Sequence, residues 1–464
     1  MFNPFEASHR VGLFAKERTR TTNRIRIVIF TVGTEGDARP YAALAQGLAD
    51  AGHDVVVATS REFEGFVRAH GLGFAPLTAD FLEMMRRSKA VIDRRSQIAM
   101  VRTLMSETRR MAESWADESL AAAAGADLVI GSGNVSLIGA SVAEKLGIPY
   151  VRSQLQPFDP SRALPPVLFR PPAVPLPGAI NLALYRVLRV IAWRMMQRAV
   201  NGVRHDLGLR PYPWTGPWAL SYGAGGRILY GFSAQVVPRQ PEWPERIAMP
   251  GYFILKEAER YTPPLALEQF LSDGPAPIYI GFGSMVSSKA RDLARVVVEA
   301  VRLSGHRALV GTGWAGLGDD LDCSDDMLVV GSVPHDWLFP RVALAVHHCG
   351  AGTTAAAVRA GIPTVPVPFV GDQFFWAWQL GRLGVATPSL DRRRLTAAQL
   401  AEAIRLAGKP KMIERAAALG ERVRAEDGVA AAIRQLERWG LLPEVKPAQS
   451  KGGPTRIGST TPAT

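Results

Sequence analysis

The sequence predicts an α/β protein of two Rossmann-like domains, each built on a parallel sheet. The chain has 464 residues, and a single hydrophobic core stops growing at roughly 250–300 residues, so two domains are expected. Short apolar runs alternate with helical patterns twice along the chain, which is typical of parallel sheets covered by helices. A proline-rich segment separates the two series, and we interpret it as an interdomain linker.

The first series begins with a short β-branched strand over residues 25–30. It ends in a glycine-containing turn from Gly33 to Asp37, and a helical pattern follows over 41–51, so the three segments form one strand-turn-helix unit. Further strands are predicted over 53–58, 127–131 and 148–151, and further helices over 61–71 and 136–146.

A proline-rich segment over 158–177 predicts an extended loop across the edge of this sheet. In the helix that follows, one stripe is apolar and most arginines lie elsewhere; the stripe contains Leu184, Leu188, Ile191 and Met195, and the arginines are Arg186, Arg189 and Arg198. Two interpretations stay open. The stripe belongs to the core and the arginines are solvated, or the helix forms a membrane or lipid-acceptor surface.

The second series repeats the pattern of the first. Strands are predicted over 278–282, 308–310, 328–330, 344–347 and 364–367, and helices over 291–303, 354–360 and 396–439, the last with a break near Gly408 and Pro410. We therefore divide the chain into a basic arm (1–24), a first domain (25–237), a linker (238–264), a second domain (265–442) and a polar tail (443–464) that is expected to be disordered.

The composition limits the classes of protein to be considered. Apolar residues make up 47% and charged residues 21%, which is ordinary for a globular protein. The net charge of +12 favours contact with polyanions or anionic membranes without choosing between them. Only Cys323 and Cys349 are present, so neither a disulfide framework nor a cysteine zinc site is expected. A cytoplasmic protein without signal peptide or membrane-spanning helix is predicted. Peripheral contact with the inner face of the membrane is compatible with this prediction.

The segment from His347 to Thr354 lies between a predicted strand and a predicted helix. Its glycines allow backbone amides to approach an anion closely, and a helix N-terminus adds partial positive charge, so a diphosphate is the expected ligand. A glycine-rich turn alone is weak evidence, because many such turns are only tight connections. The two adjacent histidines, His347 and His348, face opposite ways on a strand and do not form a ready metal pair.

Two further strand ends carry polar groups. Asp372 and Gln373 follow the strand over 364–367, and an acid beside an amide suits the recognition of sugar hydroxyls. The segment that begins at Gly331 and contains Ser332 and Val333 closes another strand, where a nucleobase can be held by backbone groups and packing.

The run from Ser332 through Gln373 resembles the donor-binding segment of the nucleotide-sugar glycosyltransferases, which include plant secondary-metabolite, antibiotic-tailoring and sterol 3β-glucosyltransferases. Residues 277–285 and 333–340 are most similar to the sterol glucosyltransferase-like branch, and residues 31–41 are similar to its opening motif. The matching motifs occur in the same order near both ends of the folded region, so the resemblance covers nearly the whole chain except its two tails.

The resemblance implies a GT-B architecture, with an N-terminal acceptor domain, a C-terminal donor domain and a cleft between them. It implies that the donor is a UDP- or dTDP-sugar, used as a co-substrate without metal or other cofactor. The donor-contacting residues that it implies are Gly283, Ser284, His348, Gly350, Ala351, Gly352 and Thr353 for the diphosphate, Ser332 and Val333 for the base, and Asp372 and Gln373 for the sugar.

Three positions depart from the family pattern. Ala356 stands where plant members have a ribose-binding glutamate, and Ser332 where they have a tryptophan that stacks on the base. These two departures leave the choice between uridine and thymidine open. Cys349 replaces a glycine that is common in bacterial relatives, a small change that we expect to be tolerated.

Asp37 is the expected catalytic base. It falls where antibiotic-tailoring members of the family have an aspartate and plant members a histidine. An acceptor hydroxyl is a poor nucleophile at neutral pH, so a carboxylate or an imidazole within hydrogen-bond reach is expected to take its proton as the new bond forms. Attack opposite the leaving diphosphate then inverts the sugar centre. Asp37 is also suitably placed to cap a helix, and the residues alone leave both roles open.

The expected reaction is transfer of a hexose, glucose or a deoxyhexose such as rhamnose, to a hydroxyl of a lipophilic acceptor such as a sterol, a glycolipid or a natural-product aglycone. An apolar acceptor is suggested by Phe158, Leu164, Val167, Leu168 and Phe169. No nucleic-acid partner is expected.

Two other classes compete with this prediction. A nicotinamide-dependent oxidoreductase would need the dinucleotide-binding pattern G-x-G-x-x-G. Gly281 and Gly283 match its first two glycines, but Val286 stands at the third, so the pattern is incomplete. The other is a non-catalytic protein that binds membranes or polyanions through the basic charge.

The acidic pair Asp320 and Asp322 matches a metal-binding pattern of another glycosyltransferase architecture, but its acidic, glycine-rich neighbourhood favours a solvated loop.

Overall fold

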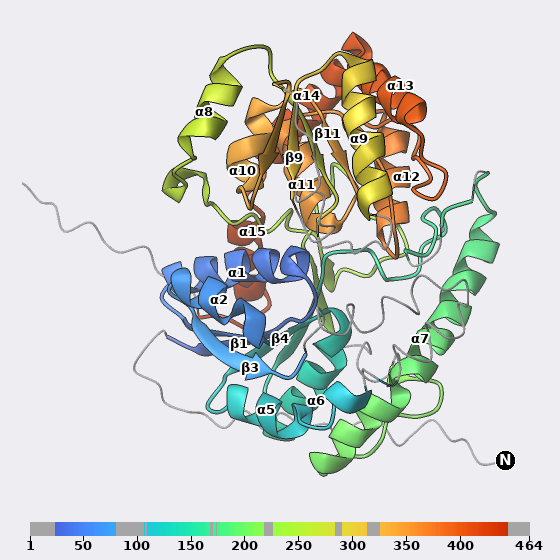
Figure 1. Ribbon diagram of the computed structural model, residues 1–464. Coiled ribbons are helices and arrows are strands. Elements are labelled where there is room, and N and C mark those ends of the chain that lie inside the picture. The colour runs from blue at the N-terminus through green and yellow to red at the C-terminus, as the bar shows by residue number, and fades with distance from the viewer. Residues whose placement is uncertain are drawn as a thin grey trace, which may run out of the picture.

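The computed structural model describes residues 24–79, 106, 109–167, 170–172, 174–217, 226–283, 290–312 and 325–443. Nearly all of the predicted basic arm and tail lie outside these residues, as do Ser284, Cys323 and the acidic pair at 320 and 322. The described chain forms two sheets with flanking helices, one in each half of the molecule (Figure 1). The predicted pair of Rossmann-like domains is confirmed.

The N-terminal sheet has seven parallel strands in the order β3-β2-β1-β4-β5-β6-β7. The strands are β1 (Arg26–Phe30), β2 (Asp54–Ser60), β3 (Gly73–Leu77), β4 (Leu128–Ser132), β5 (Tyr150–Gln154), β6 (Arg227–Tyr230) and β7 (Ile247–Ala248). The helical elements are α1 (Glu35–Asp50), η1 (Arg61–Phe63), α2 (Glu64–Ala69), α5 (Trp115–Ala122), η2 (Gly133–Val135), α6 (Ser136–Leu146) and α7 (Gly178–Asp206). The direction of strand addition reverses between β1 and β4, and ligands bind at such a switch point in open parallel sheets.

The C-terminal sheet has five parallel strands in the order β10-β9-β8-β11-β12. The strands are β8 (Ile278–Gly281), β9 (Ala308–Gly311), β10 (Met327–Val330), β11 (Ala345–His347) and β12 (Thr364–Pro366). The helical elements are η4 (Ala258–Arg260), α8 (Leu265–Ser272), α9 (Ala290–Ser304), α10 (His335–Leu338), η5 (Phe339–Arg341), α11 (Ala351–Ala360), α12 (Gln373–Leu383), α13 (Ala397–Ala407), α14 (Pro410–Arg424) and α15 (Gly428–Arg438). Its switch point lies between β8 and β11.

Alternate residues of the central strands enter different cores. In β1, Val28 and Phe30 pack in one cluster, whereas Ile27 and Ile29 pack in another on the opposite face. Side chains of a strand point alternately to its two faces, so a strand covered on both sides is apolar throughout. The short β-branched runs of the sequence are therefore correct predictors of the buried strands.

Two segments lie elsewhere than the sequence suggests. Strand β7, inside the predicted linker 238–264, pairs with β6 and completes the N-terminal sheet. Helix α15, inside the predicted second domain, packs on α1, where Ala432 and Leu436 are fully buried in the N-terminal core. An amphipathic helix reveals that one of its faces is buried but not which core receives it.

The predicted helix over 396–439 is divided into three. The break expected near Gly408 and Pro410 separates α13 from α14, and a second break before Asp427 separates α14 from α15. The Asp427 side chain accepts a hydrogen bond from the amide of Ala430, 2.9 Å away, and so caps the new helix.

Gly420 supplies the first testable prediction, because α14 passes close to the C-cap of α11 at this residue. A Cβ at position 420 would lie 2.5 Å from the Cα of Gly361. Backbone cannot move aside as a side chain can, so Gly420→Ala should lower the free energy of unfolding by about 1–3 kcal/mol. Denaturant unfolding measures the change.

The control is Gly381→Ala, in the exposed part of α12, where an added Cβ meets nothing within 4 Å. Alanine is favoured over glycine in a helix interior, so this variant should be at least as stable as the parent chain. Equal stability of the two variants would contradict the close packing of α11 on α14.

Candidate active site

Helix N-termini from both halves of the chain converge at the two switch points. Helix α1 begins after β1, and α11 begins after β11. A Cβ added to Gly352, in the first turn of α11, would lie 3.7 Å from Gly36 in the first turn of α1. Helix N-termini carry partial positive charge and unpaired amides, so their meeting point favours an anion.

Asp37 lies in the first turn of α1, with Thr34 as the N-cap. Its Oδ2 accepts hydrogen bonds from the Thr34 amide (2.9 Å) and the Thr34 hydroxyl (3.2 Å). Gly33, with a φ of +148°, lies so close that a Cβ there would meet Oδ2 at 2.2 Å. Asp37 is thus the third residue of a capping box and not the cap itself. Because no hydrogen bond to Oδ1 forms within the described part of the chain, that oxygen remains available to a ligand.

Burial changes the acidity of Asp37. Loss of solvation raises the pKa of its carboxyl from 3.8 to about 6; the hydrogen bond from the Thr34 amide opposes this, and repulsion from Asp372 adds to it. A carboxylate with a pKa near neutrality is a better proton acceptor than an ordinary aspartate and is still ionised above pH 6. The geometry and the acidity are therefore compatible with a general base.

Asp372 faces the same region from the C-terminal half. Its Oδ2 accepts a hydrogen bond from Gln156 Nε2 across the domain boundary (2.9 Å) and one from Trp376 Nε1 (3.2 Å). Burial raises the pKa of Asp372, and these two donors oppose the rise. Asp372 also precedes α12, so a third helix N-terminus lies at the site.

Gln373 differs from its neighbour in orientation. Its Oε1 accepts hydrogen bonds from the amides of Phe369 (2.7 Å) and Val370 (3.0 Å), and the residue is buried. The amide oxygen therefore holds the loop before α12 in shape. The predicted contact with a sugar hydroxyl remains a prediction.

The ring of His348 is packed between two glycines. A Cβ at Gly350 would lie 2.5 Å from its Nε2, and a Cβ at Gly283 would lie 2.8 Å from its Cε1. Burial lowers the pKa of His348 to about 4, so the ring is neutral at pH 7 and acts by hydrogen bonding. Its buried Nδ1 has no hydrogen-bond partner among the described residues, as expected of a group that hydrogen-bonds to a ligand when the ligand is bound.

The two adjacent histidines have different surroundings, as the strand pattern predicts. His347 Nδ1 accepts a hydrogen bond from the Cys349 amide (3.0 Å), and its Nε2 lies 3.3 Å from Thr364 Oγ1. His347 is therefore part of the core. Cys349 has a φ of +64°, a left-handed conformation that favours glycine. The family's glycine at this position would suit the backbone better than cysteine does.

The other predicted donor-contacting residues lie around this centre. Gly350 is the N-cap of α11, and Ala351, Gly352 and Thr353 form its first turn, each partly exposed. Gly283 follows β8, and Ser332 and Val333 follow β10, so all lie beyond the carboxyl ends of parallel strands of one sheet. The predicted set is thus brought to one edge, with Ser284 outside the described residues.

Within the described residues no cluster of three or more His, Cys, Asp or Glu side chains is arranged to hold a metal ion.

The residues that were expected to bind an apolar acceptor lie in two different situations. Leu164 and Val167 are buried in a core cluster, with Phe158 packed against it, while Leu168 and Phe169 lie outside the described residues. Leu164 and Val167 therefore stabilise the fold in this structure and do not line an open surface.

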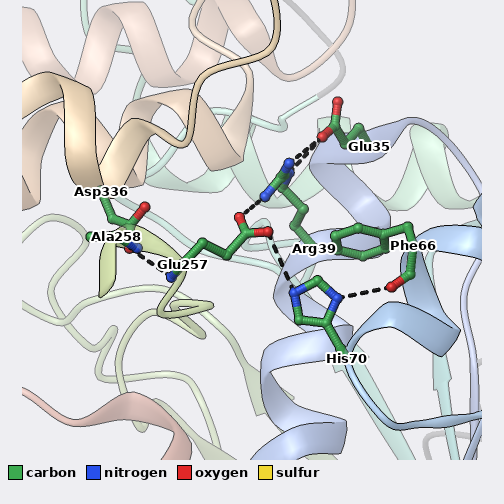
Figure 2. Close-up of polar contacts among 7 residues, drawn as sticks. All are labelled: Glu35, Arg39, Phe66, His70, Glu257, Ala258 and Asp336. Atoms are coloured by element: carbon green, nitrogen blue, oxygen red, sulfur yellow. Dashed lines mark hydrogen bonds and ion pairs between the residues drawn. The ribbon is translucent and has the colours of Figure 1, made fainter. Parts of the chain in front are cut away.

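A polar bridge joins α1 to the C-terminal half, as Figure 2 shows. Arg39 forms ion pairs with Glu35 (2.6 Å) and with Glu257 in the interdomain segment. The amide of Glu257 donates to Asp336 Oδ2 at the start of α10 (2.9 Å), and His70 Nε2 lies 3.4 Å from Glu257 Oε1. The bridge fixes the helix that carries Asp37 relative to the second sheet.

Sequence reasoning missed Gln156, Arg39 and Glu257. Gln156 lies just before the proline-rich loop and Glu257 in the predicted linker, where no periodic pattern marks a side chain as functional. Arg39 lies two residues beyond Asp37. Only the arrangement of the two domains reveals these three residues.

Family comparisons divide the chain into the same two parts. Residues 27–165 match the glycosyltransferase family 28 N-terminal domain, and residues 317–437 match the C-terminal domain of the erythromycin biosynthesis protein CIII-like family.

The chain is also similar to fungal sterol 3-beta-glucosyltransferases. The one from Emericella nidulans is 37% identical over 93% of this chain, and the one from Candida albicans is 34% identical over 91%. The chain spans only about a third of the length of these relatives, 32% and 28% respectively.

Among solved structures, the glycosyltransferase of kitacinnamycin covers 90% of this chain and all of its own, with a TM-score of 0.64 and 18% identity. The spinosyn rhamnosyltransferase SpnG, complexed with spinosyn aglycone, covers 89% of this chain and all of its own, with a TM-score of 0.59 and 19% identity. These likenesses establish the two-domain fold. No helix in the described ranges combines the length and apolar character needed to cross a membrane.

The packing of His348 supplies the second prediction. Gly350→Ala should leave the backbone unstrained, because residue 350 has an ordinary φ of −62°, but its Cβ must displace the imidazole ring. Loss of one well-placed hydrogen-bonding group should weaken binding of UDP or dTDP at least tenfold. Isothermal titration calorimetry measures the affinity.

Gly65→Ala in α2 is the matched control, since an added Cβ there meets nothing within 4 Å. Its affinity for the nucleotide should equal that of the parent chain. An unchanged affinity of Gly350→Ala would show that His348 takes no part in holding the diphosphate.

Proposed function

Since the chain belongs to the GT-B glycosyltransferases, with a family 28 N-terminal domain and an erythromycin CIII-like C-terminal domain, we propose that it moves a hexose from a UDP- or dTDP-sugar to a hydroxyl of a lipophilic acceptor. The observation that carries this proposal is the partly buried Asp37 carboxylate with its raised pKa, which lies where the N-termini of α1 and α11 meet. The names of the fungal relatives support a sterol and glucose; a glycolipid or natural-product aglycone and rhamnose are the alternatives.

The proposed step is a direct displacement at the anomeric carbon. The acceptor oxygen bonds to that carbon while the bond from carbon to the diphosphate oxygen breaks, and Asp37 accepts the acceptor's proton. Because the nucleophile attacks opposite the leaving group, the sugar centre is inverted. The diphosphate leaves with an additional negative charge, and the first-turn amides of α11 with neutral His348 stabilise it.

We further propose that no metal is required. The first-turn amides of α11 and the nearby N-termini of α1 and α12 stabilise the leaving diphosphate instead. Asp372, held by Gln156 and Trp376, and the adjoining Gln373 are proposed to recognise the sugar, and Ser332 with Val333 the base. The proposed compartment is the cytoplasm, where nucleotide sugars would be the co-substrates.

A panel of candidate ligands tests the proposal. UDP-glucose or a dTDP-sugar at 100 times its dissociation constant should stabilise the folded chain by about 2.7 kcal/mol, seen as a rise in melting temperature, whereas NADH should have no effect. Mass spectrometry of reactions with a sterol and a UDP-sugar should then detect the glycoside, with and without a chelator. Stabilisation by NADH alone, or no glycoside with any activated hexose, would contradict the function.

Asp37 supplies the third prediction. Because its pKa is raised to about 6, the base is active only when ionised, so kcat/KM should fall as the pH drops through about 6 and level off above it. The Asp37→Asn side chain cannot accept the proton, so kcat should fall by about 10²–10⁴-fold. The decrease in kcat/KM near pH 6 should also disappear from the pH profile of this variant. Melting temperatures measured with UDP should show that the variant still binds the nucleotide.

Asp50→Asn is the control, since Asp50 is the last residue of the same helix and is exposed. It should keep the parent rate and the parent pH profile. A normal rate for Asp37→Asn would place the base elsewhere, while the donor-binding half of the proposal would stand.

A further inference from the structure

Helix α7 has one firmly packed face. Tyr185, Trp193, Val200 and Val203 are buried along it. The Trp193 indole donates a hydrogen bond to the carbonyl of Pro213 at 3.0 Å. Near the two ends of the helix, the Asn181 side chain donates to the carbonyl of Arg162 (2.9 Å) and Arg204 Nε to the carbonyl of Arg210 (2.7 Å). Figure 1 shows α7 as a long helix at the side of the molecule. The helix therefore keeps a fixed orientation on the N-terminal domain.

Its outer face is also apolar. Ile180, Val187, Val190 and Ile191 are exposed, with exposed fractions of 48%, 53%, 42% and 48%. At 100° per residue, positions 180, 187 and 191 fall within about 40° of one another, so they form a single row. No other helix in the described ranges exposes more than one large apolar side chain.

This finding corrects one of the two sequence interpretations. The stripe of Leu184, Leu188, Ile191 and Met195 is not the core face, because Ile191 is exposed and the other three are only partly buried. The buried face lies to one side of that stripe and is the one that carries Trp193. Apolar residues thus occupy more of the circumference of α7 than its core contacts require.

The charges beside this row all have one sign. Arg186, Arg194 and Arg198 are exposed, whereas Arg189 and Arg204 are paired with Asp159 and Glu144. Residues 178–205 contain no Asp or Glu. Like charges would repel one another if two copies of the chain met through this face, whereas an anionic surface complements it.

Two further exposed apolar side chains lie in segments next to the helix. Val174, just before α7, is 73% exposed, and Trp214 is 69% exposed in the segment whose Pro213 carbonyl accepts the bond from Trp193. Tryptophan is favoured at the boundary between lipid and water, where an apolar ring meets a polar layer. Apolar residues backed by arginines are the features of a helix that lies in such a boundary.

We propose that the outer face of α7, defined by Ile180, Val187, Val190 and Ile191 with the flanking Arg186, Arg194 and Arg198, docks the protein on an anionic lipid bilayer. The apolar row enters the headgroup layer and the arginines contact lipid phosphates. The helix lies on the surface and does not span it. This inference goes beyond glycosyl transfer and does not depend on it.

Vesicle flotation without sugar donor is the fourth prediction and tests this surface. The full chain should float with vesicles of phosphatidylcholine and phosphatidylglycerol, less with phosphatidylcholine alone, and less in high salt. The double variant Val187→Glu with Ile191→Glu should lower partitioning at least tenfold, because two apolar side chains become charges. Both positions are exposed, so the fold should be retained, and an unchanged melting temperature checks this.

Ile413→Glu on α14 is the matched control, because Ile413 is an isolated apolar side chain with a similar exposed fraction of 43%. It should float like the parent chain. Each of Arg186→Gln, Arg194→Gln and Arg198→Gln should reduce binding to phosphatidylglycerol vesicles by about fivefold and leave binding to phosphatidylcholine unchanged.

Equal flotation of the parent chain and the double variant would overturn the proposal. So would light scattering that shows a dimer for the parent chain, a monomer for the double variant and no vesicle binding for either, since the face would then join two copies. Donor-induced stabilisation measured on the same variants keeps a failure of this inference separate from a failure of the proposed function.

Discussion

Two partly buried carboxylates from opposite domains, Asp37 and Asp372, impose the constraint on which the rest of the structure depends. Neither forms an ion pair with a cationic side chain in the described ranges, and their repulsion helps to raise the pKa of Asp37. Such a pair is tolerated only where amides, neutral donors and helix N-termini surround it. The two sheets must therefore be held in one relative position.

That position is held by contacts that do not involve the Asp37 carboxylate itself. The Glu257 bridge fixes α1 against the start of α10, and Gln156 reaches from the N-terminal loop to Asp372. Close packing of α14 at Gly420 fixes the end of α11, whose first turn lies at the candidate site. The site is thus assembled from parts that neither domain contains alone, and its acidity depends on both domains.

Much of this could be predicted from the sequence. The β-branched runs identify the strands, and the small residues after β11 predict the candidate anion site, because the strand period and the need for close backbone approach are local properties. The rest depends on tertiary context. Nothing local distinguishes β7 from a linker, assigns α15 to the N-terminal core, or shows that Ile191 faces outward. Likewise, only the folded loop shows that Gln373 Oε1 is occupied by backbone amides.

Helix α15 has a consequence for how the chain acquires its structure. Ala432 and Leu436 complete a core whose first strand begins at Arg26. During synthesis, an N-terminal domain ordinarily folds before the residues behind it emerge from the ribosome. Here α15, the last helix of the described residues, supplies part of the N-terminal core, so part of the apolar surface of the N-terminal half stays uncovered until α15 has been synthesised. Ribosome-bound intermediates would therefore need protection by chaperones.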